Sequence, residues 1–296
     1  MTSPATDPRL FQAEIIAVTG GGSGLGRRYC LDLAAAGARV LVVGRGDNVH
    51  ATAAAIRDAG GDARACRAAV DDGATVVATA LDWAGRLDGL ALNAGHVQDR
   101  SFAKMSADEW RDVIQVHLDA AFALASAAWP HLAAAPAGRL VLTTSGAGLH
   151  GNFGQVNYAA AKAGLIGLMK TLSIEGARHG IKVNAVAPMA ATAMTDGVFD
   201  QQVAAALSDE GVSPFVMALL HPGCEISGKI LEVGAGWAGV VRWQRSQGLR
   251  VGAGAAGAAE VLAGWDQLLD FERDSDHPTS VRDSLRGALP HLFPTA

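Results

Sequence analysis

Short apolar runs alternate with longer stretches of helical periodicity along most of the chain. Runs rich in β-branched and small apolar residues predict strands at 15–18, 40–43, 63–68, 87–92, 139–144, 181–186 and 229–233. Apolar positions at three- and four-residue spacing predict helices at 25–36, 51–59, 75–84, 107–134 and 156–179, the fourth of them broken near Trp129 and Pro130. Apolar strands separated by helices are typical of a parallel sheet covered on both faces. The pattern therefore predicts a single α/β domain over residues 10–240.

The last part of the chain follows a different pattern. Residues 251–259 are mostly Ala and Gly, which predicts a flexible loop before a terminal helix at 260–271. We therefore expect residues 241–296 to form an extension of the domain. Its first residues, Arg242 and Trp243, and the preceding Trp237 leave two roles open, a subunit contact or a cap over a pocket.

Composition and charge narrow the class of protein. Half of the 296 residues are hydrophobic and 18% are charged, which favours a folded domain over a disordered chain. The net charge of −5 argues against a nucleic-acid partner. The cysteines, Cys30, Cys66 and Cys224, are widely spaced and predict core residues, with no disulfide framework and no metal site. No signal peptide or membrane span is predicted, so the expected location is cytoplasmic.

A glycine-rich loop follows the first predicted strand and opens the first predicted helix. Glycines at this position permit a tight turn and let backbone N–H groups and the helix N-terminus approach a pyrophosphate. The strand–loop–helix context predicts a dinucleotide site of the Rossmann type. The residues expected to line it are Gly20, Gly22, Ser23, Gly24, Leu25 and Gly26.

The end of the second predicted strand bears on the choice of nucleotide. Folds of this type often place an acidic residue there to hold the adenosine ribose hydroxyls. Here the strand ends in Gly44 and Arg45, with no acid at either position. A guanidinium can bind a ribose 2′-phosphate through two parallel hydrogen bonds. The residues therefore favour NADP as cofactor, with NAD left open because Arg45 can also lie on the surface or stack on adenine.

One tyrosine and one lysine are spaced for proton transfer. Tyr158 precedes Lys162 by four residues on a predicted helix, so both side chains face one side. A nearby ammonium favours the phenolate, which predicts a lowered pKa for the tyrosine and a role as general acid or base. Ser145 follows the fifth predicted strand, where its hydroxyl can hold the reacting oxygen.

With Leu92-Asn93-Ala94-Gly95, these motifs resemble the short-chain dehydrogenases/reductases over about residues 14–235. A nearer likeness is to the (3R)-hydroxyacyl-CoA dehydrogenase branch found in type-two peroxisomal multifunctional enzymes, and it extends over nearly the whole chain. Bacterial single-domain relatives of that branch are named hydroxyacyl-CoA or 17β-hydroxysteroid dehydrogenases. The segments that carry this likeness are HLDAAF at 117–122, GNFGQVNYAAAK at 151–162, EVGAGW at 232–237, RW at 242–243 and DFER at 270–273.

The resemblance implies a doubly wound sheet of seven parallel strands, a homodimer or homotetramer, and catalysis by Ser145, Tyr158 and Lys162. In the family the tyrosine and lysine also hold the nicotinamide ribose. Further cofactor contacts are implied at Val70, Asn93, Ala94, Gly95, Pro188 and Thr192. The chain departs from the broad family pattern at Leu92, Ala69 and Met189, and it has Gly44 where the nearer branch carries Asp.

His117 stands where the broad family carries an asparagine that anchors a proton-relay water, and the nearer branch shares the histidine. Two interpretations remain open. Either an imidazole nitrogen binds the relay water, or the ring is a helix histidine satisfied by a backbone carbonyl. Residues 189–213 likewise leave open a mobile lid over an apolar substrate or an ordinary surface helix.

The predicted reaction is hydride transfer between a nicotinamide cofactor and a secondary alcohol or ketone. By resemblance, the substrate is an apolar small molecule, first a (3R)-3-hydroxyacyl-CoA and second a 17β-hydroxysteroid or its CoA counterpart. A non-catalytic NADP-binding module is the alternative of another class, since fold does not fix function. Ser145, Tyr158 and Lys162 argue against that alternative, because a sensor has no need of all three.

Overall fold

We describe a computed structural model of the chain that covers residues 10–190, 207–272 and 275–288. The chain divides into two compact units, Met1–Val240 and Val241–Ala296, and each is described by itself. Thr192 and most of the segment considered as a lid, 191–206, lie outside the described residues.

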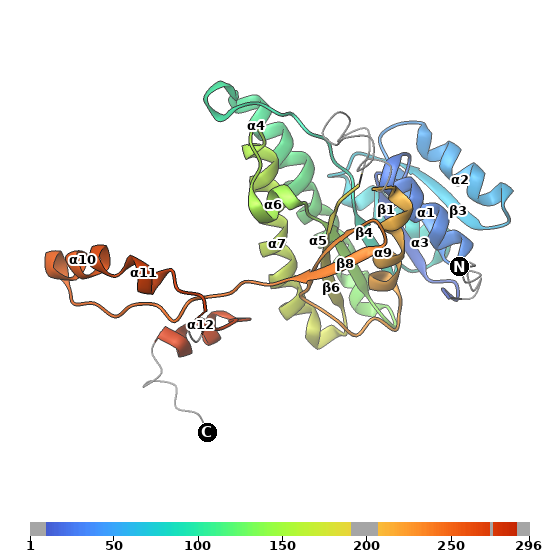
Figure 1. The fold of residues 1–296 in the computed structure, drawn as a ribbon. Coiled ribbons are helices and arrows are strands. Elements are labelled where there is room, and N and C mark those ends of the chain that lie inside the picture. The colour runs from blue at the N-terminus through green and yellow to red at the C-terminus, as the bar shows by residue number, and fades with distance from the viewer. Residues whose placement is uncertain (1–9, 191–206, 273–274, 289–296) are drawn as a thin grey trace. The chain divides into compact units, whose positions relative to one another are not determined.

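An eight-stranded sheet forms the centre of the larger unit (Figure 1). The strand order is β3-β2-β1-β4-β5-β6-β7-β8, and the pairs from β3 to β7 are parallel. This order confirms the predicted doubly wound α/β fold, with its reversal between β1 and β4. The strands are β1 Ile15–Thr19, β2 Arg39–Gly44, β3 Asp62–Arg67, β4 Gly89–Leu92, β5 Arg139–Thr143, β6 Lys182–Pro188, β7 Ile230–Gly234 and β8 Trp237–Val241.

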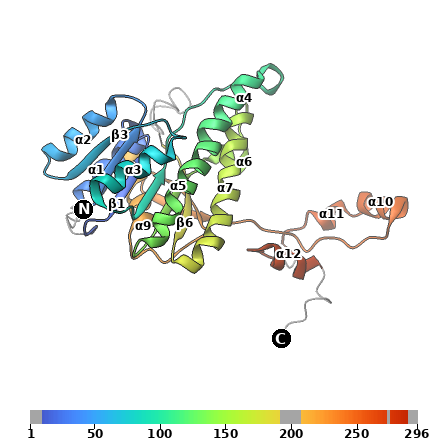
Figure 2. The same cartoon turned by 180° about the vertical axis from the view of Figure 1, so that it is seen from behind.

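Two groups of helices cover the sheet, and the two views from opposite sides show the strands between them (Figures 1 and 2). In one group, α1 packs against α2 and α9; in the other, α5 packs against α3 and α7. Cys30 and Cys66 are buried as predicted, whereas Cys224 is half-buried. Within the described ranges, no helix is long and apolar enough to cross a membrane. The bounds are α1 Gly24–Ala35, α2 Asn48–Asp58, α3 Gly73–Ala84, α4 Ala107–Ile114, α5 Ala120–Ala134, α6 Gly146–His150, α7 Val156–Gly176 and α9 Ser213–Leu220, with 3₁₀ turns at Phe102–Lys104, Ala177–His179 and Asp209–Gly211.

The eighth strand corrects the expected count of seven. Only Ala235 and Gly236 join β7 to β8. Both have a positive φ, 50° at Ala235 and 75° at Gly236. Two successive positive φ angles form the tight turn of a hairpin, so β8 returns antiparallel to β7. Alanine seldom adopts a positive φ, so the pair gave no hairpin signal in the sequence.

The helical stretch at 107–134 also differs from expectation. Pro130 lies inside α5, so the break expected near Trp129 and Pro130 is wrong. Ala128 and Leu132 are buried on either side of the proline, and this packing holds the helix together through it. The irregularity lies earlier, at Gln115–Asp119, where one π-helical turn joins α4 to α5.

The smaller unit contains α10 Gly254–Ala263, α11 Trp265–Leu268 and α12 Val281–Ala288. The flexible loop expected at 251–259 is therefore wrong beyond Ala253, because alanine is a strong helix former and outweighs the glycines among these residues. Inside this unit Arg245 and Asp276 form both a backbone bridge and an ion pair with Nη2 2.5 Å from Oδ2.

Candidate active site

The carboxyl ends of β1, β4, β5 and β6 surround one cavity of about 360 Å³. This is the edge of a doubly wound sheet where ligands bind, beside the reversal of strand order. The cavity brings together most of the predicted cofactor and catalytic residues. It is lined by Gly20, Ser23, Gly24, Leu25, Asn93, Ala94, Gly95, His117, Thr143, Thr144, Ser145, Tyr158, Lys162, Pro188 and Ala190.

The glycine-rich loop leaves no space for side chains on its inner side. A Cβ on Gly26 would lie 2.3 Å from the carbonyl oxygen of Gly20, so this glycine lets α1 pack tightly against the loop and does not line the cavity. Gly20 has a positive φ of 69°, and a Cβ there would meet Ala94 at 3.1 Å. Gly24, at φ 48°, has open space above it. This loop fits the close approach of a pyrophosphate to backbone N–H groups.

Thr19 fixes the loop after β1 against the loop after β4. Its hydroxyl oxygen accepts hydrogen bonds from the backbone N–H groups of Asn93 at 2.9 Å and Ala94 at 3.0 Å. The Asn93 side chain in turn donates to the Thr19 carbonyl at 3.3 Å. Asn93 therefore shapes the cleft through protein contacts, and Thr19 is a positioning residue that the sequence interpretation missed.

Ser145 is the N-cap of α6, where its hydroxyl oxygen accepts from the backbone N–H of Ala147 at 3.2 Å. Burial raises the pKa of Tyr158, and the nearby Ser145 hydroxyl only partly opposes that effect. This direction differs from the predicted lowering by an ammonium.

Lys162 itself carries less positive charge than that prediction assumed. It is buried, and its Nζ donates to the carbonyl oxygen of Thr143 at 2.7 Å. The same Nζ lies 5.5 Å from the centre of the Tyr158 ring. Burial lowers the pKa of Lys162 to about 7, so the side chain carries only part of a charge at neutral pH. The sequence argument assumed a full ammonium charge, which burial does not permit.

The first turn of α7 is held by Asn157, a fully buried residue that the sequence interpretation passed over. Its amide nitrogen donates to the carbonyl oxygens of Gln98 and Glu109, at 3.1 and 3.0 Å. Its amide oxygen accepts from the backbone N–H of Tyr158 at 2.7 Å. Asn157 thereby ties the tyrosine to α4 and to the loop before it. Its only sequence signal was its place next to Tyr158.

His117 projects from the π-helical turn and is 3% exposed. Its Nε2 lies 2.6 Å from the carbonyl oxygen of His96, and its ring meets the Tyr158 ring edge to face at 5.1 Å. Among the described residues, its Nδ1 is buried without a hydrogen-bond partner. Burial and the nearby Lys162 lower the pKa of His117 to about 3, so the ring is neutral. The carbonyl contact fits the second interpretation, while the unpartnered Nδ1 leaves the first available.

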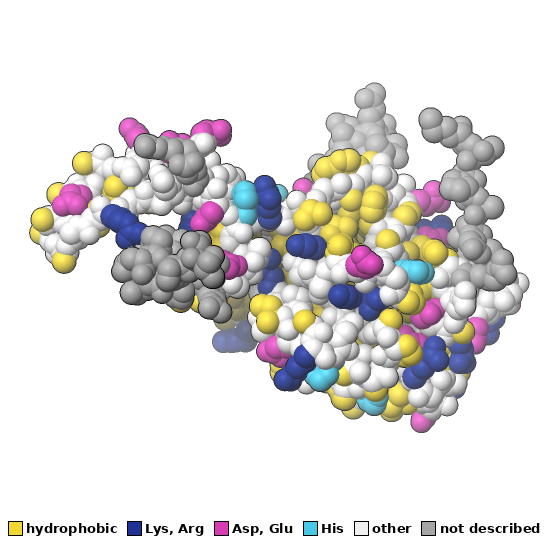
Figure 3. Space-filling view, turned by 90° about the horizontal axis from the view of Figure 1, so that it is seen from below, with side chains coloured by type: hydrophobic (Ala, Val, Ile, Leu, Met, Phe, Trp, Pro, Cys, Tyr) yellow, Lys and Arg dark blue, Asp and Glu magenta, His cyan; other side chains and the backbone are white. Residues whose placement is uncertain are grey.

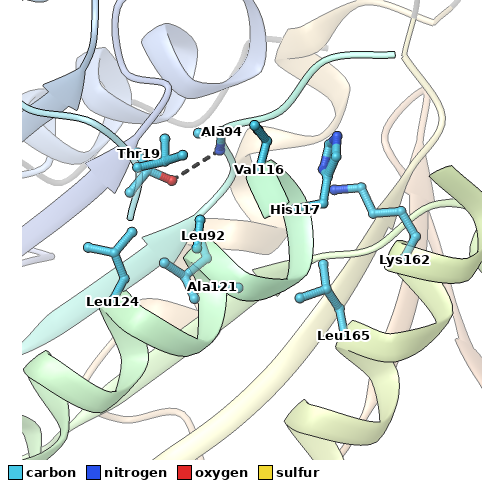
Figure 4. Close-up of a pocket in the computed structure, with 11 residues that line it drawn as sticks. Thr19, Leu92, Ala94, Val116, His117, Ala121, Leu124, Lys162 and Leu165 are labelled. Atoms are coloured by element: carbon cyan, nitrogen blue, oxygen red, sulfur yellow. Dashed lines mark hydrogen bonds between the residues drawn. The ribbon is translucent and has the colours of Figure 1, made fainter. Parts of the chain in front are cut away.

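A second, small cavity separates His117 from the sheet (Figure 4). The Lys162 side chain extends from α7 toward His117, which projects from the π-helical turn. Thr19 and Leu92 bound the cavity on the sheet side. Its volume of about 10 Å³ matches the space that a single buried water needs.

A third cavity, of about 290 Å³, extends from the glycine-rich loop to the ends of β2 and β3. Gly22, Gly44, Arg45, Asn48 and Val70 line it. Arg45 is exposed, and among the described residues its guanidinium has no ion-pair or hydrogen-bond partner. Asn48, the first residue of α2, was not predicted as a site residue because nothing in the local sequence marks it.

Arg67, at the end of β3, is a second guanidinium near this cavity that the sequence interpretation missed. Its Nε donates to the backbone carbonyl of Arg45 at 3.1 Å. Its Nη1 lies 3.2 Å from the carboxylate of Asp47. These contacts connect β3 to the segment between β2 and α2, which is where the sequence argument placed the choice of nucleotide.

A comparison with protein families matches residues 14–203 to the short chain dehydrogenase family. Among curated proteins, the chain is 39% identical over 297 aligned positions to the peroxisomal multifunctional enzyme type 2 of Mus musculus. That alignment covers 96% of this chain and 40% of the mouse protein, so the chain spans less than half of that relative's length.

Two solved structures are also similar. Full-length peroxisomal multifunctional enzyme type 2 from Drosophila melanogaster superposes with a TM-score of 0.83 at 34% identity, over 95% of this chain and half of that one. An NAD(P)-dependent relative from Beutenbergia cavernae, solved with NADP bound at low occupancy, gives a TM-score of 0.70 at 32% identity. That match covers 77% of this chain and 98% of the relative. Relatives that share the fold therefore include one that binds NADP.

Proposed function

Because the chain belongs to the short-chain dehydrogenase family and is thus an oxidoreductase of CH–OH groups, we propose that it acts on a (3R)-3-hydroxyacyl-CoA and its 3-ketoacyl-CoA partner. The observation that carries the proposal is the shared cavity in which Ser145, Tyr158 and Lys162 meet the glycine-rich loop. The similarity to peroxisomal multifunctional enzymes supports the substrate class. A non-catalytic module would not require the three side chains to converge.

Each side chain has a distinct role in this proposal. The bound nicotinamide nucleotide supplies hydride transfer. The Ser145 hydroxyl, which lines the same cavity as the phenol, holds the substrate oxygen. Tyr158 gives a proton to that oxygen in reduction and takes it in oxidation. Lys162, fixed by the Thr143 carbonyl, stabilises the phenolate and holds the nucleotide's ribose.

His117 connects Tyr158 and Lys162 to a path for proton transfer. A water in the cavity of about 10 Å³ would lie beside His117 and Lys162, whose Nδ1 and Nζ can form hydrogen bonds with it. Nε2 also lies 3.2 Å from the backbone nitrogen of His96. In the tautomer whose Nε2 donates to the His96 carbonyl, Nδ1 is the acceptor nitrogen of the neutral ring. In this proposal His117 holds the water that resupplies Lys162 with a proton.

NADP is the proposed nucleotide, with NAD as the competing one. Gly44 places no side chain at the end of β2, and Arg45 has an unpaired guanidinium within the described part of the chain. A free guanidinium beside an adenosine site favours the additional charge of a 2′-phosphate. Val70 is proposed to contact the adenine, and Thr192 remains a predicted contact outside the described residues.

Initial rates on two substrates test the proposal. We expect turnover of acetoacetyl-CoA with NADPH to exceed turnover of an oestradiol-type steroid with NADP by at least tenfold in kcat/KM, about 1.4 kcal/mol of transition-state stabilisation. Faster steroid turnover would assign the second substrate class. Nucleotide binding without turnover of either substrate would favour the non-catalytic module.

We also propose that the smaller unit makes a subunit contact in a homodimer or homotetramer. It exposes large apolar side chains, among them Leu262, Trp265 and Leu269. Figure 3 shows where hydrophobic side chains reach the surface on one face of the molecule. Exposed apolar groups of this size favour burial against a partner. Sedimentation of the intact chain and of Leu262→Glu tests this, since the variant should shift toward monomer. The cytoplasmic location stays a prediction.

A further inference from the structure

The carboxamide of Asn48 lies directly over the glycine-rich loop, although the two are separated by more than twenty residues. A Cβ on Gly22 would lie 2.4 Å from both Cγ and Oδ1 of Asn48, and 2.6 Å from Nδ2. A Cβ on Gly46 would lie 3.0 Å from the same Oδ1. The amide therefore fills the space between the loop after β1 and the loop after β2, and Gly22 is a glycine partly because Asn48 is there.

This amide has unused hydrogen-bonding capacity. Asn48 is exposed, and in the described ranges no residue hydrogen-bonds its side chain. It lines the cavity of about 290 Å³ together with Gly22, Arg45 and Val70. A side-chain amide carries two donors and one acceptor, so it can bond either a hydroxyl or a phosphate.

The position of Asn48 indicates which part of a bound dinucleotide its amide would contact. Pyrophosphates bind at the glycine-rich loop, and the adenosine ribose binds at the end of the second strand. The Asn48 amide touches the first region at Gly22 and the second at Gly46. The group that links the two regions in a dinucleotide is the adenosine ribose.

Resting on the proposed function, we propose that Asn48 is a second nucleotide-binding residue at this end of the cleft, whose amide bonds the 2′ substituent of the adenosine ribose. It accepts from the 2′-hydroxyl of NAD or donates to the 2′-phosphate of NADP. Asn48 thus accommodates both nucleotides, and Arg45 tips the balance toward NADP.

The surrounding charges suit this role. Arg67 pairs with Asp47, the residue before Asn48, with 3.2 Å between Nη1 and Oδ1. It also donates to the Arg45 carbonyl, so one guanidinium holds both ends of the segment 45–47, which directly precedes the amide of Asn48. The pairing draws the Asp47 carboxylate toward β3, which limits its repulsion of a 2′-phosphate.

The test is the dissociation constant of NADPH and of NADH, measured by nucleotide fluorescence on the intact chain. Asn48→Asp should weaken NADPH by about tenfold or more and leave NADH within about threefold of the parent or tighter, since a carboxylate accepts from hydroxyls and repels phosphate. Asn48→Ala should weaken both by about three- to tenfold, the loss of one hydrogen bond. An acidic residue is favourable in the first turn of a helix, so Asn48→Asp should fold.

His50→Asp is the matched control, because it adds a carboxylate to the same helix at an exposed position that does not line the cavity. If it shifts the NADPH/NADH ratio as far as Asn48→Asp does, the effect is general charge and the contact is rejected. Unchanged constants in Asn48→Ala would also overturn the inference. A parent chain that binds neither nucleotide would instead refute the proposed function.

Discussion

The two ends of the proposed nucleotide cleft are built in opposite ways. Around Tyr158 the polar groups are buried and held by protein hydrogen bonds, as Lys162 is by the Thr143 carbonyl. At the adenosine end, Arg45 and Asn48 are exposed, and within the described residues their side chains have no partners. The chemical end is organised before any ligand arrives, whereas the recognition end makes its side-chain contacts only with the ligand.

This difference predicts how each end responds to substitution. Changes in a buried polar cluster alter both the chemistry and the stability, because unpaired polar groups there are costly. Changes at an exposed recognition site alter binding preference with little cost in stability. The experiments below test that contrast from its largest expected effect to its smallest.

Replacing Tyr158 with Phe should produce the largest effect. It removes the proton-transferring hydroxyl while keeping the ring that packs against His117. We expect kcat to fall by about 10²- to 10⁴-fold, with the dissociation constant of NADPH within a few-fold of the parent. Steady-state kinetics and fluorescence titration measure the two quantities. A variant that turns over at the parent rate would remove Tyr158 from the mechanism.

His117 should make the protein less stable in acid. Its pKa is about 3 in the folded chain, against an ordinary value of 6.5, so between those pH values the unfolded state binds more protons. The free energy of unfolding therefore falls as pH drops from 6.5 toward 3. When the pH falls from 7 to 4.5, the free energy of unfolding should decrease in both proteins. The decrease should be about 2 to 3 kcal/mol smaller for His117→Asn than for the parent.

Urea unfolding at the two pH values measures this difference. His50→Asn is the control, since His50 is exposed and should leave the pH dependence of the parent unchanged. A His117→Asn variant with the acid sensitivity of the parent would show that His117 does not titrate as its burial requires.

Gly95 should tolerate no side chain while His117 is present. An alanine Cβ would lie 2.0 Å from Cε1 of the imidazole, which forces the ring to move. We expect Gly95→Ala to destabilise the fold by about 1 to 3 kcal/mol, and His117→Ala to relieve part of that cost in the double variant. Thermal unfolding of the four proteins completes the cycle.

Gly167→Ala provides the matched control for Gly95. Gly167 lies inside α7 with no atom within 4 Å of the new Cβ, so the alanine should stabilise the fold by about 0.5 to 1 kcal/mol. Additive costs for Gly95→Ala and His117→Ala would show that the glycine and the imidazole are not in contact.

Arg45→Asp should have the smallest effect on the fold and a specific effect on binding. Removing a free guanidinium and adding a carboxylate should lower the preference for NADP over NAD by about tenfold, with an unchanged midpoint of thermal unfolding. Competition between the two nucleotides measures the ratio. An unchanged ratio would reject Arg45 as a phosphate contact and blur the contrast between the two ends.

The sequence predicted the features that depend on local spacing. The four-residue interval from Tyr158 to Lys162 is one helical turn, and Ser145 follows a strand, so their convergence in one cavity required only the predicted sheet. The predicted doubly wound fold is also confirmed. It could be predicted because short apolar strands between helices permit few other arrangements.

Features that depend on distant contacts were not predicted. Asn48 carries no local signal, because its importance comes from its contact with Gly22. The lowered pKa of Lys162 comes from burial, which spacing does not reveal. Pro130 was expected to break a helix that tertiary packing holds intact. The eighth strand depends on a positive φ at Ala235, which alanine disfavours.

The π-helical turn at Gln115–Asp119 makes the direction of one imidazole depend on the number of residues in a helix. An α-helix advances by about 100° per residue. Deleting one residue from this turn would restore ordinary α-helical hydrogen bonding and change the direction in which the side chains of the turn itself project. Insertions and deletions here would therefore disconnect the histidine from the tyrosine even if every amino acid of the cleft were preserved.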